Sequence, residues 1–115
     1  MPEEPKATNG VAVSPTSALT REFGPEDWRR AQDALARALD PHGASSRVAW
    51  ANPKTAMRGS FAPAGQPFVK SDEICRAFEA TIDGQAPARR IEGTACRPSG
   101  GDWSIKTVRP LSRRA

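Results

Sequence analysis

Residues 75–96 read CRAFEATIDGQAPARRIEGTAC, and this stretch decides the fold. Apolar and polar residues alternate on both sides of residues 84–87, a segment whose glycine and proline are typical of a turn. If the chain reverses there, one antiparallel register puts the apolar positions of both arms on one face and Cys75 opposite Cys96. We therefore predict a β-hairpin with strands at residues 74–83 and 88–97.

The chain has only these two cysteines. A disulfide between them would contribute about 3 kcal/mol to stability, and it implies an oxidising compartment. The alternative is a pair of free thiols in the core. The same register sets Glu79 against Glu92, and this opposition of like charges counts mildly against it.

A helix is predicted at residues 25–40. Gly24 suits the N-cap, Pro25 suits the first helical position, and Glu26 and Asp27 favour the positive end of the helix dipole. Phe23 and Trp28 occupy the two positions of a hydrophobic staple. The apolar stripe that follows is amphipathic; its members are Trp28, Ala31, Leu35, Ala38 and Leu39.

The remaining strands are short and follow one another through tight turns. They are expected near residues 47–50, 57–61 and 103–107, with Gly59 allowing close approach of a neighbouring backbone. An antiparallel meander needs a cover for its apolar face, and the amphipathic helix supplies it. The predicted fold is α+β, with one N-terminal amphipathic helix on a four- to five-stranded antiparallel meander sheet. The predicted parts are a disordered leader at residues 1–22, a single domain at 23–109 and a basic C-terminal tail at 110–115.

The formal net charge is +4 and the isoelectric point is about 9.7. Residues 106–115 contain no acid and carry four positive charges, so residues 1–105 are neutral in sum. The four cations are Lys106, Arg109, Arg113 and Arg114. The basicity therefore predicts a solvated tail, with weak attraction to anionic lipids or polyanions as the alternative. It does not predict sequence-specific nucleic-acid binding. No apolar run reaches the roughly 18 residues of a membrane span.

Reactive side chains are few. His42 is the only histidine and follows the predicted helix end, where a solvated C-cap residue is the expected role. The two cysteines match no zinc-ligand spacing. We predict no catalytic residue, no metal site and no cofactor.

A candidate binding surface combines an aromatic residue with arginines. Three tryptophans are expected in the core, and the alternative is that Trp50, beside a predicted turn, lies exposed at a binding surface. Arginines that follow the cysteines or the hairpin turn are candidates for a small anion site, although a solvated sheet face is the default. These arginines are Arg76, Arg89, Arg90 and Arg97.

An ordered set of short motifs lies between residues 28 and 108. It consists of Trp50-Ala51-Asn52-Pro53, Gly59, Cys75-Arg76-Ala77-Phe78, Gly93-Thr94-Ala95-Cys96-Arg97 and Gly101-Asp102-Trp103-Ser104-Ile105. This set resembles the C-terminal domain of the rickettsial-type surface antigen family, whose members are envelope proteins and often outer-membrane lipoproteins. The resemblance implies no catalytic residues. The chain lacks the lipobox cysteine and the glycine-rich segment of that family, so a protein of the periplasm or outer membrane, with its signal or anchor absent from this chain, is expected.

Together these patterns predict a non-catalytic interaction or scaffold domain of the bacterial cell envelope, with an envelope protein or a cell-wall component as partner. One alternative is a small periplasmic inhibitor that inserts its loop at residues 63–67 into a hydrolase. The other is a weak binder of polyanions or anionic lipids through the basic tail.

Overall fold

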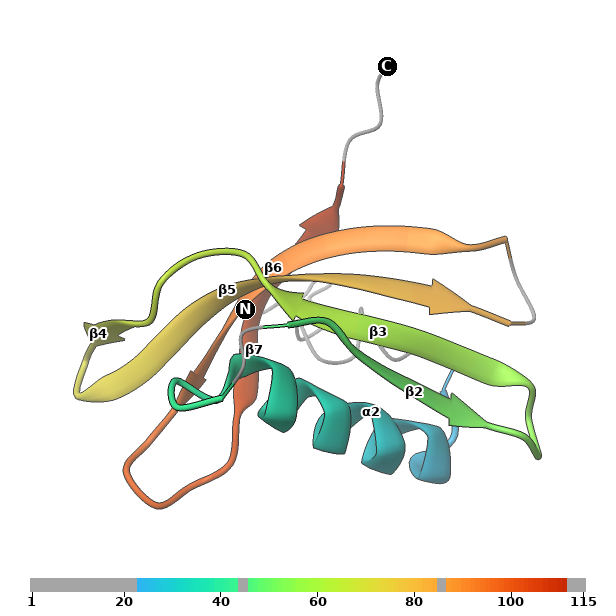
Figure 1. The fold of residues 1–115 in the computed structure, drawn as a ribbon, viewed down its shortest axis with the longest axis horizontal. Coiled ribbons are helices and arrows are strands. Elements are labelled where there is room, and N and C mark those ends of the chain that lie inside the picture. The colour runs from blue at the N-terminus through green and yellow to red at the C-terminus, as the bar shows by residue number, and fades with distance from the viewer. Residues whose placement is uncertain (1–22, 44–45, 85–86, 112–115) are drawn as a thin grey trace, which may run out of the picture.

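The computed structural model describes residues 23–43, 46–84 and 87–111. In these ranges one helix and six strands form an α+β fold (Figure 1). The elements are α2 (Pro25–Leu39), β2 (Val48–Asn52), β3 (Met57–Pro63), β4 (Phe68–Lys70), β5 (Glu73–Asp83), β6 (Arg89–Arg97) and β7 (Ser104–Pro110). The predicted fold class is confirmed, with one strand more than expected. The predicted leader lies outside the described residues.

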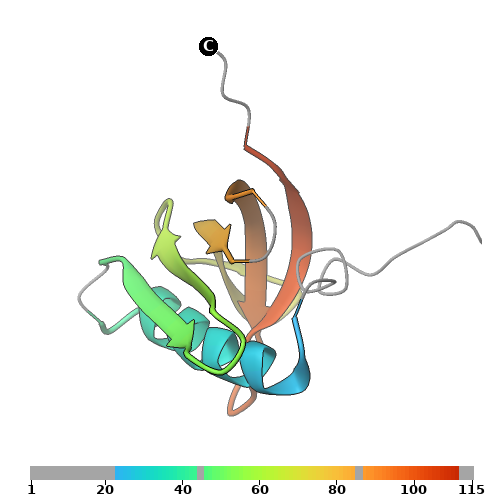
Figure 2. The ribbon, with the colours of Figure 1, turned by 90° about the vertical axis from the view of Figure 1, so that its right-hand side faces the viewer.

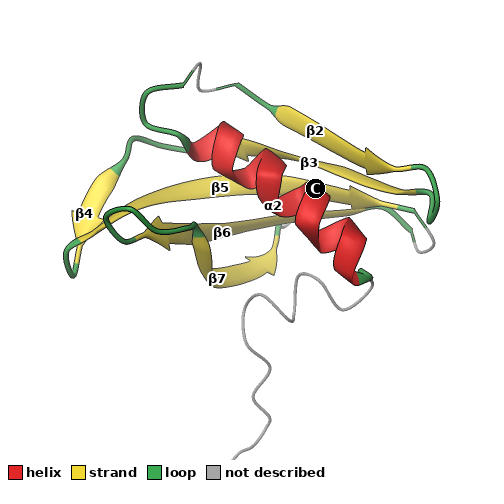
Figure 3. Cartoon of the chain, turned by 90° about the horizontal axis from the view of Figure 1, so that it is seen from below, coloured by secondary structure: helices red, strands yellow, loops and turns green. Residues whose placement is uncertain are grey.

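All strand pairs are antiparallel. The sheet has the order β2-β3-β5-β6-β7, and β4 pairs with the beginning of β5. The helix α2 lies across one face of this sheet, as Figures 2 and 3 show from two directions. We call this side the covered face and the other side the open face. The helix therefore acts as the cover that the amphipathic pattern predicted.

The core lies between α2 and the covered face. Leu35 and Leu39 of the helix are fully buried, and Phe61 and Phe78 of the sheet pack edge to face beneath them, with ring centroids 5.7 Å apart. Trp28 is half-buried at the margin. Successive residues of a strand point to opposite faces, so the alternation in the sequence decides which residues enter this core.

The β5–β6 register agrees with the prediction. Cys75 pairs with Cys96, and the apolar positions of the two strands fall together on the covered face. Glu79 does oppose Glu92. A β-bulge interrupts the β6–β7 ladder between Thr94 and the next residue.

Two glycines allow the strands to approach closely. A Cβ atom on Gly59 would lie 2.3 Å from the Thr81 carbonyl oxygen and 2.9 Å from Nε1 of Trp50. A Cβ atom on Gly93 would lie 2.1 Å from the Thr107 carbonyl oxygen. Neither position accepts a larger residue without movement of backbone, as expected for Gly59 from its place in a strand.

The strand β4 was not predicted. It forms a tight hairpin with β5 through Ser71 and Asp72, whose φ angles are 53° and 65°. Positive φ at both central residues is typical of a type I′ turn, which usually contains glycine or asparagine. Ser-Asp is a weak turn signal, and three residues show too little alternation to identify a strand.

Candidate functional site

The disulfide lies on the open face. Cys75 and Cys96 are joined with their Cα atoms 4.0 Å apart, and both are buried. The predicted pairing is confirmed, and the alternative of free thiols is wrong. A hollow of about 400 Å³ adjoins the bond, with walls from β4, β5, β6 and β7.

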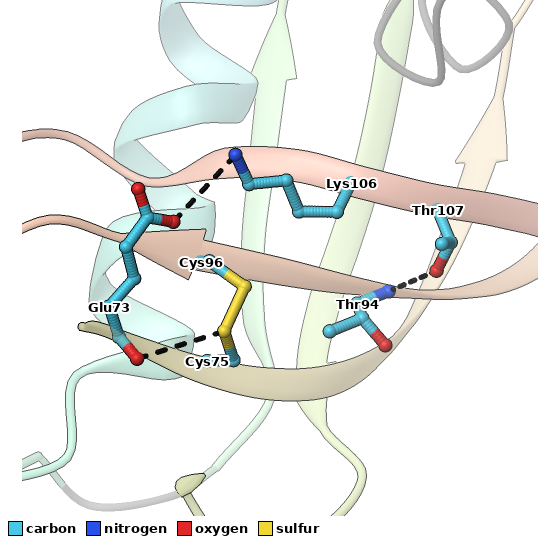
Figure 4. The surroundings of a disulfide bond; sticks show 6 residues. All are labelled: Glu73, Cys75, Thr94, Cys96, Lys106 and Thr107. Carbon is cyan, nitrogen blue, oxygen red and sulfur yellow. Dashed lines mark hydrogen bonds and ion pairs between the residues drawn. A yellow bond between two sulfur atoms is a disulfide. The ribbon is translucent and has the colours of Figure 1, made fainter. Parts of the chain in front are cut away.

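Polar contacts surround this disulfide (Figure 4). Lys106 reaches across from β7 to the Glu73 carboxylate at 3.7 Å. The Thr94 backbone N–H donates to the Thr107 hydroxyl at 3.1 Å. These contacts tie β7 to its neighbours around the covalent link between β5 and β6.

Two further ion pairs lie on the open face. The opposed carboxylates are each matched by an arginine, Glu79 by Arg90 at 3.7 Å and Glu92 by Arg109. These pairs remove the like-charge penalty that the sequence predicted. The side chains are largely exposed, so each pair contributes only about 0–1 kcal/mol.

Trp50 belongs to the core and not to an exposed binding surface. Only 7% of it is exposed, and Phe23 packs edge-on against its ring at 5.1 Å. The alternative that placed Trp50 at an exposed binding surface is therefore wrong. The interpretation of the tryptophans as core residues holds for Trp50 and also for Trp103.

Arg76 is buried on the covered face, where it holds the helix C-terminus. Its Nη1 donates to the carbonyl oxygens of Leu39 and Asp40, both at 3.4 Å, and its Nε donates to the Gly65 carbonyl at 2.9 Å. A cation at this end also complements the helix dipole. Arg76 therefore connects three segments of the fold.

The other arginines of the predicted anion site are far apart along the hairpin. Arg97 lies opposite Ile74 and stacks on the Trp103 ring, with its guanidinium carbon 5.7 Å from the ring centroid. Arg89 and Arg90 lie at the opposite end, beside the β5–β6 turn. Eight residues of extended strand separate these ends, roughly 26 Å. The structure does not bring the four arginines into one site.

The predicted basic tail requires a correction. Lys106 and Arg109 belong to β7 and form ion pairs with acids of the open face. Arg113 and Arg114 lie outside the described residues. Half of the charge assigned to the tail is therefore part of the folded sheet. Lys106 and Arg109 are three residues apart, and the bulge in the β6–β7 ladder lets both lie on the open face beside Glu73 and Glu92.

A buried polar cluster joins the helix N-terminus to the β2–β3 turn. The Asp27 carboxylate accepts hydrogen bonds from Asn52 Nδ2 at 2.8 Å, from the Thr55 hydroxyl at 2.7 Å and from the Gly24 N–H at 3.0 Å. Burial acts to raise the pKa of Asp27, but these three hydrogen bonds outweigh it and leave the pKa below its ordinary value of 3.8. No pattern in the sequence predicted this cluster, because Asp27 and Asn52 are 25 residues apart and lie on different elements.

The two large hydrophobic residues that are most exposed in the described chain are adjacent. Phe68 is 44% exposed and Val69 is 74% exposed, and both belong to β4. A hollow of about 200 Å³ beside them is almost entirely apolar; its walls are Pro41, Pro67, Phe68, Val69 and Ile74. No residue of β4 was among the predicted site residues, because two apolar residues in a row carry no periodic signal.

Reactive groups do not converge in the described residues. His42 is exposed, and its backbone N–H donates to the Asp40 carboxylate at 2.9 Å. Within residues 23–43, 46–84 and 87–111, no cluster of three or more histidine, cysteine, aspartate or glutamate side chains could hold a metal ion. Over the same ranges, no helix has the length and apolarity needed to cross a membrane.

The family model for the 17 kDa outer membrane surface antigen matches residues 37–104, more than half of the chain. The chain belongs to this family. No curated protein and no solved structure matches it.

The residues that carry the resemblance to the surface antigens build the fold. Asn52 anchors the helix N-terminus and Arg76 its C-terminus, while Gly59 and Gly93 allow close strand packing. The paired cysteines join β5 to β6. The surface antigen motifs thus specify how the helix is held on the sheet and how the strands pack.

Proposed function

We propose that this chain is a non-catalytic interaction module of the bacterial cell envelope, situated in the periplasm or at the outer membrane. Its contact surface is the end of the sheet formed by β4. The observation that carries the proposal is the pairing of two exposed hydrophobic side chains, Phe68 and Val69, on one short strand. An exposed apolar patch on an otherwise polar surface is typical of a site of protein contact.

The compartment and the absence of catalysis have separate support. A buried disulfide is typical of a protein that folds in an oxidising compartment, and the surface antigen family is named for the outer membrane. The buried ionisable groups Asp27 and Arg76 are both used to hold the helix. This leaves them without a role in general acid–base chemistry.

The contacts around the alternative sites do not favour the other two functions. The loop at residues 63–67 is tied to β5, because the Ala64 N–H donates to Ala77 and Arg76 donates to Gly65. Such a loop is rigid, as an inhibitory loop must be, but its exposed residues Ala64, Gly65 and Gln66 offer no aromatic or charged side chain to anchor it in a hydrolase. The pairing of Lys106 and Arg109 with acids likewise weakens attraction to polyanions.

Site-specific photo-crosslinking in the source bacterium tests the contact surface. A photoreactive amino acid placed at Phe68 should give a discrete crosslinked species in the envelope fraction. The matched control is Ala49, an exposed residue of β2 on the open face, where no such species is expected. Equal crosslinking at both positions, or none at Phe68, would contradict the proposed function.

A further inference from the structure

The hydrogen-bonding groups of β4 divide between its two edges. Lys70 and Glu73 flank the two-residue turn and form a hydrogen-bonded pair, so Val69 and Ile74 form a non-hydrogen-bonded pair. The backbone N–H and C=O of Val69 therefore point away from β5. The next pair along the hairpin, Phe68 and Cys75, supports this assignment. Cys75 and Cys96 have their Cα atoms 4.0 Å apart, which is typical of a non-hydrogen-bonded pair. The N–H and C=O of Cys75 therefore point away from β6 and towards β4.

No described strand pairs with this outer edge of β4. The other two edges of the sheet are better protected. Arg30 donates from the helix to the Ala51 carbonyl of β2 at 2.9 Å. The β7 ladder has a bulge, and the strand ends in Pro110. Within the described residues, the N–H and C=O of Val69 have no hydrogen-bond partner, and they lie at the least protected of the three edges.

Side chains on both sides of this edge are apolar. Phe68 lies on the open face beside the disulfide, because it pairs with Cys75, and Val69 lies on the covered side beside Ile74. A small apolar hollow adjoins Val69, and a larger hollow adjoins Phe68. A strand added here would place successive side chains into alternate hollows, which is how sheet edges recognise extended peptides.

One charge at this edge is uncompensated. Glu73 lies opposite Lys70 in the hairpin but pairs with Lys106 at 3.7 Å. No acidic side chain of the described residues pairs with Lys70, which is exposed. An acidic residue of a bound segment, placed opposite Lys70, would complete this site.

Two other occupants fit less well. Insertion into a bilayer would leave the Val69 backbone groups without partners in hydrocarbon. Antiparallel pairing with a second copy about Val69 would set Lys70 against Phe68 of the other copy and leave the charge unmatched.

We infer that the outer edge of β4 binds an extended segment of a partner protein as an added antiparallel strand, and that this segment has an acidic residue followed by two apolar residues. The inference rests on the proposed function, whose contact surface it explains. The acidic residue lies opposite Lys70, and the two apolar residues lie opposite Val69 and Phe68.

A peptide titration of the isotope-labelled 115-residue chain, followed by NMR, tests the strand addition. The probe is the synthetic peptide acetyl-STEVLTS-amide, and its control has lysine in place of glutamate. We expect the largest amide shift and the largest slowing of hydrogen exchange at Val69, with a dissociation constant on the order of 1 mM. Absence of binding up to about 5 mM, or equal binding of the lysine peptide, would overturn the inference.

Matched variants separate backbone pairing from side-chain contact. Val69→Pro removes the edge N–H, and proline is tolerated where that group faces solvent, so affinity should fall at least about tenfold with the fold retained. Val69→Thr keeps the N–H and should bind nearly as the parent does. Lys70→Glu should reverse the preference to the lysine peptide, whereas Lys54→Glu, in the β2–β3 turn, should leave the preference unchanged.

The two proposals fail in different ways. Crosslinking at Phe68 in cells together with full peptide binding by Val69→Pro would remove the strand addition and leave the contact surface in place. Loss of crosslinking at Phe68 would remove the proposed function itself. A melting curve for Val69→Pro that matches the parent shows that its loss of binding is not a loss of fold.

Discussion

The two faces of the sheet are stabilised in different ways. On the covered face, Phe61 and Phe78 are almost completely buried beneath the helix. Burial of such apolar side chains supplies the free energy that stabilises this face. On the open face, exposed ion pairs such as Glu92–Arg109 surround one buried disulfide. A single layer of sheet cannot bury both of its sides with one helix, so the open face is held by a covalent bond instead of a second layer.

This difference separates the parts of the chain that build the fold from those that are free to bind. The buried polar residues Asn52 and Arg76 hold the two ends of the helix on the covered face. The strand β4 makes no comparable contribution, since all three of its residues are exposed. The comparison predicts large effects of substitution on the covered face and small ones on the open face, with the disulfide as the exception.

The largest effect is expected for Phe78→Ala. This side chain is fully buried, and its removal should cost about 3–5 kcal/mol in the free energy of unfolding. Its neighbour on the open face, Glu79→Ala, should cost less than about 1 kcal/mol. Chemical denaturation of both variants measures the difference, and equal losses would break the comparison of the two faces.

Removal of the disulfide should rank second. The double substitution of Cys75 and Cys96 by alanine releases a loop with a sequence separation of 21. The chain-entropy model predicts a loss of about 3 kcal/mol. Urea denaturation under oxidising and reducing conditions gives the measurement, since reduction should affect the parent and leave the double variant unchanged. A parent that is equally stable when reduced would show that the open face does not depend on the bond.

Substitution of Asp27 should cost about 1–3 kcal/mol, because Asn52 and Thr55 lose a buried acceptor. The pKa of Asp27 is lowered in the folded state, so its contribution is complete above its unfolded pKa near 3.8 and is lost as the pH falls through the folded pKa. Asp27→Asn should therefore flatten the stability profile below about pH 4. Unfolding curves from neutral to acidic pH check this result.

Glu26→Gln is the control for that profile. The pKa of Glu26 is also lowered, by hydrogen bonds from Arg29 and Arg30, but its side chain is at the surface. Its share of the acid sensitivity should disappear in high salt, whereas that of Asp27 should persist because burial reduces screening. If high salt abolished all of the acid sensitivity of the parent, surface carboxylates such as Glu26 and not the buried Asp27 would be its source.

The smallest effect is expected on the open face. Arg109→Gln breaks the ion pair with Glu92. The Arg109 side chain is 77% exposed, so solvent screens this pair. The loss should be about 0–1 kcal/mol and should vanish in high salt. A double-mutant cycle with Glu92→Gln measures the coupling, and a coupling above about 2 kcal/mol would show that the open face is held by more than its disulfide.

Local patterns allowed much of the covered face to be predicted. Alternation around the turn gave the β5–β6 register, and the spacing of apolar residues gave the helix almost to its last residue, Leu39. The site was harder to predict. Trp50 lies in the core because its strand alternates, but β4 is too short to alternate, and its two exposed apolar residues become visible as a site only when burial is known.

The sequence by itself determined every element except β4, the β5–β6 register and the cysteine pairing, because each depends on spacing within one element or along two adjacent strands. Only the tertiary structure decided how the polar residues are used. Arg76 meets the carbonyl of Leu39, 37 residues earlier, and Asn52 meets Asp27, 25 residues earlier. Such contacts depend on how the helix crosses the sheet, and no short-range periodicity encodes that geometry. The free edge of β4 could not be predicted for a different reason, because a strand of three residues is too short to show alternation.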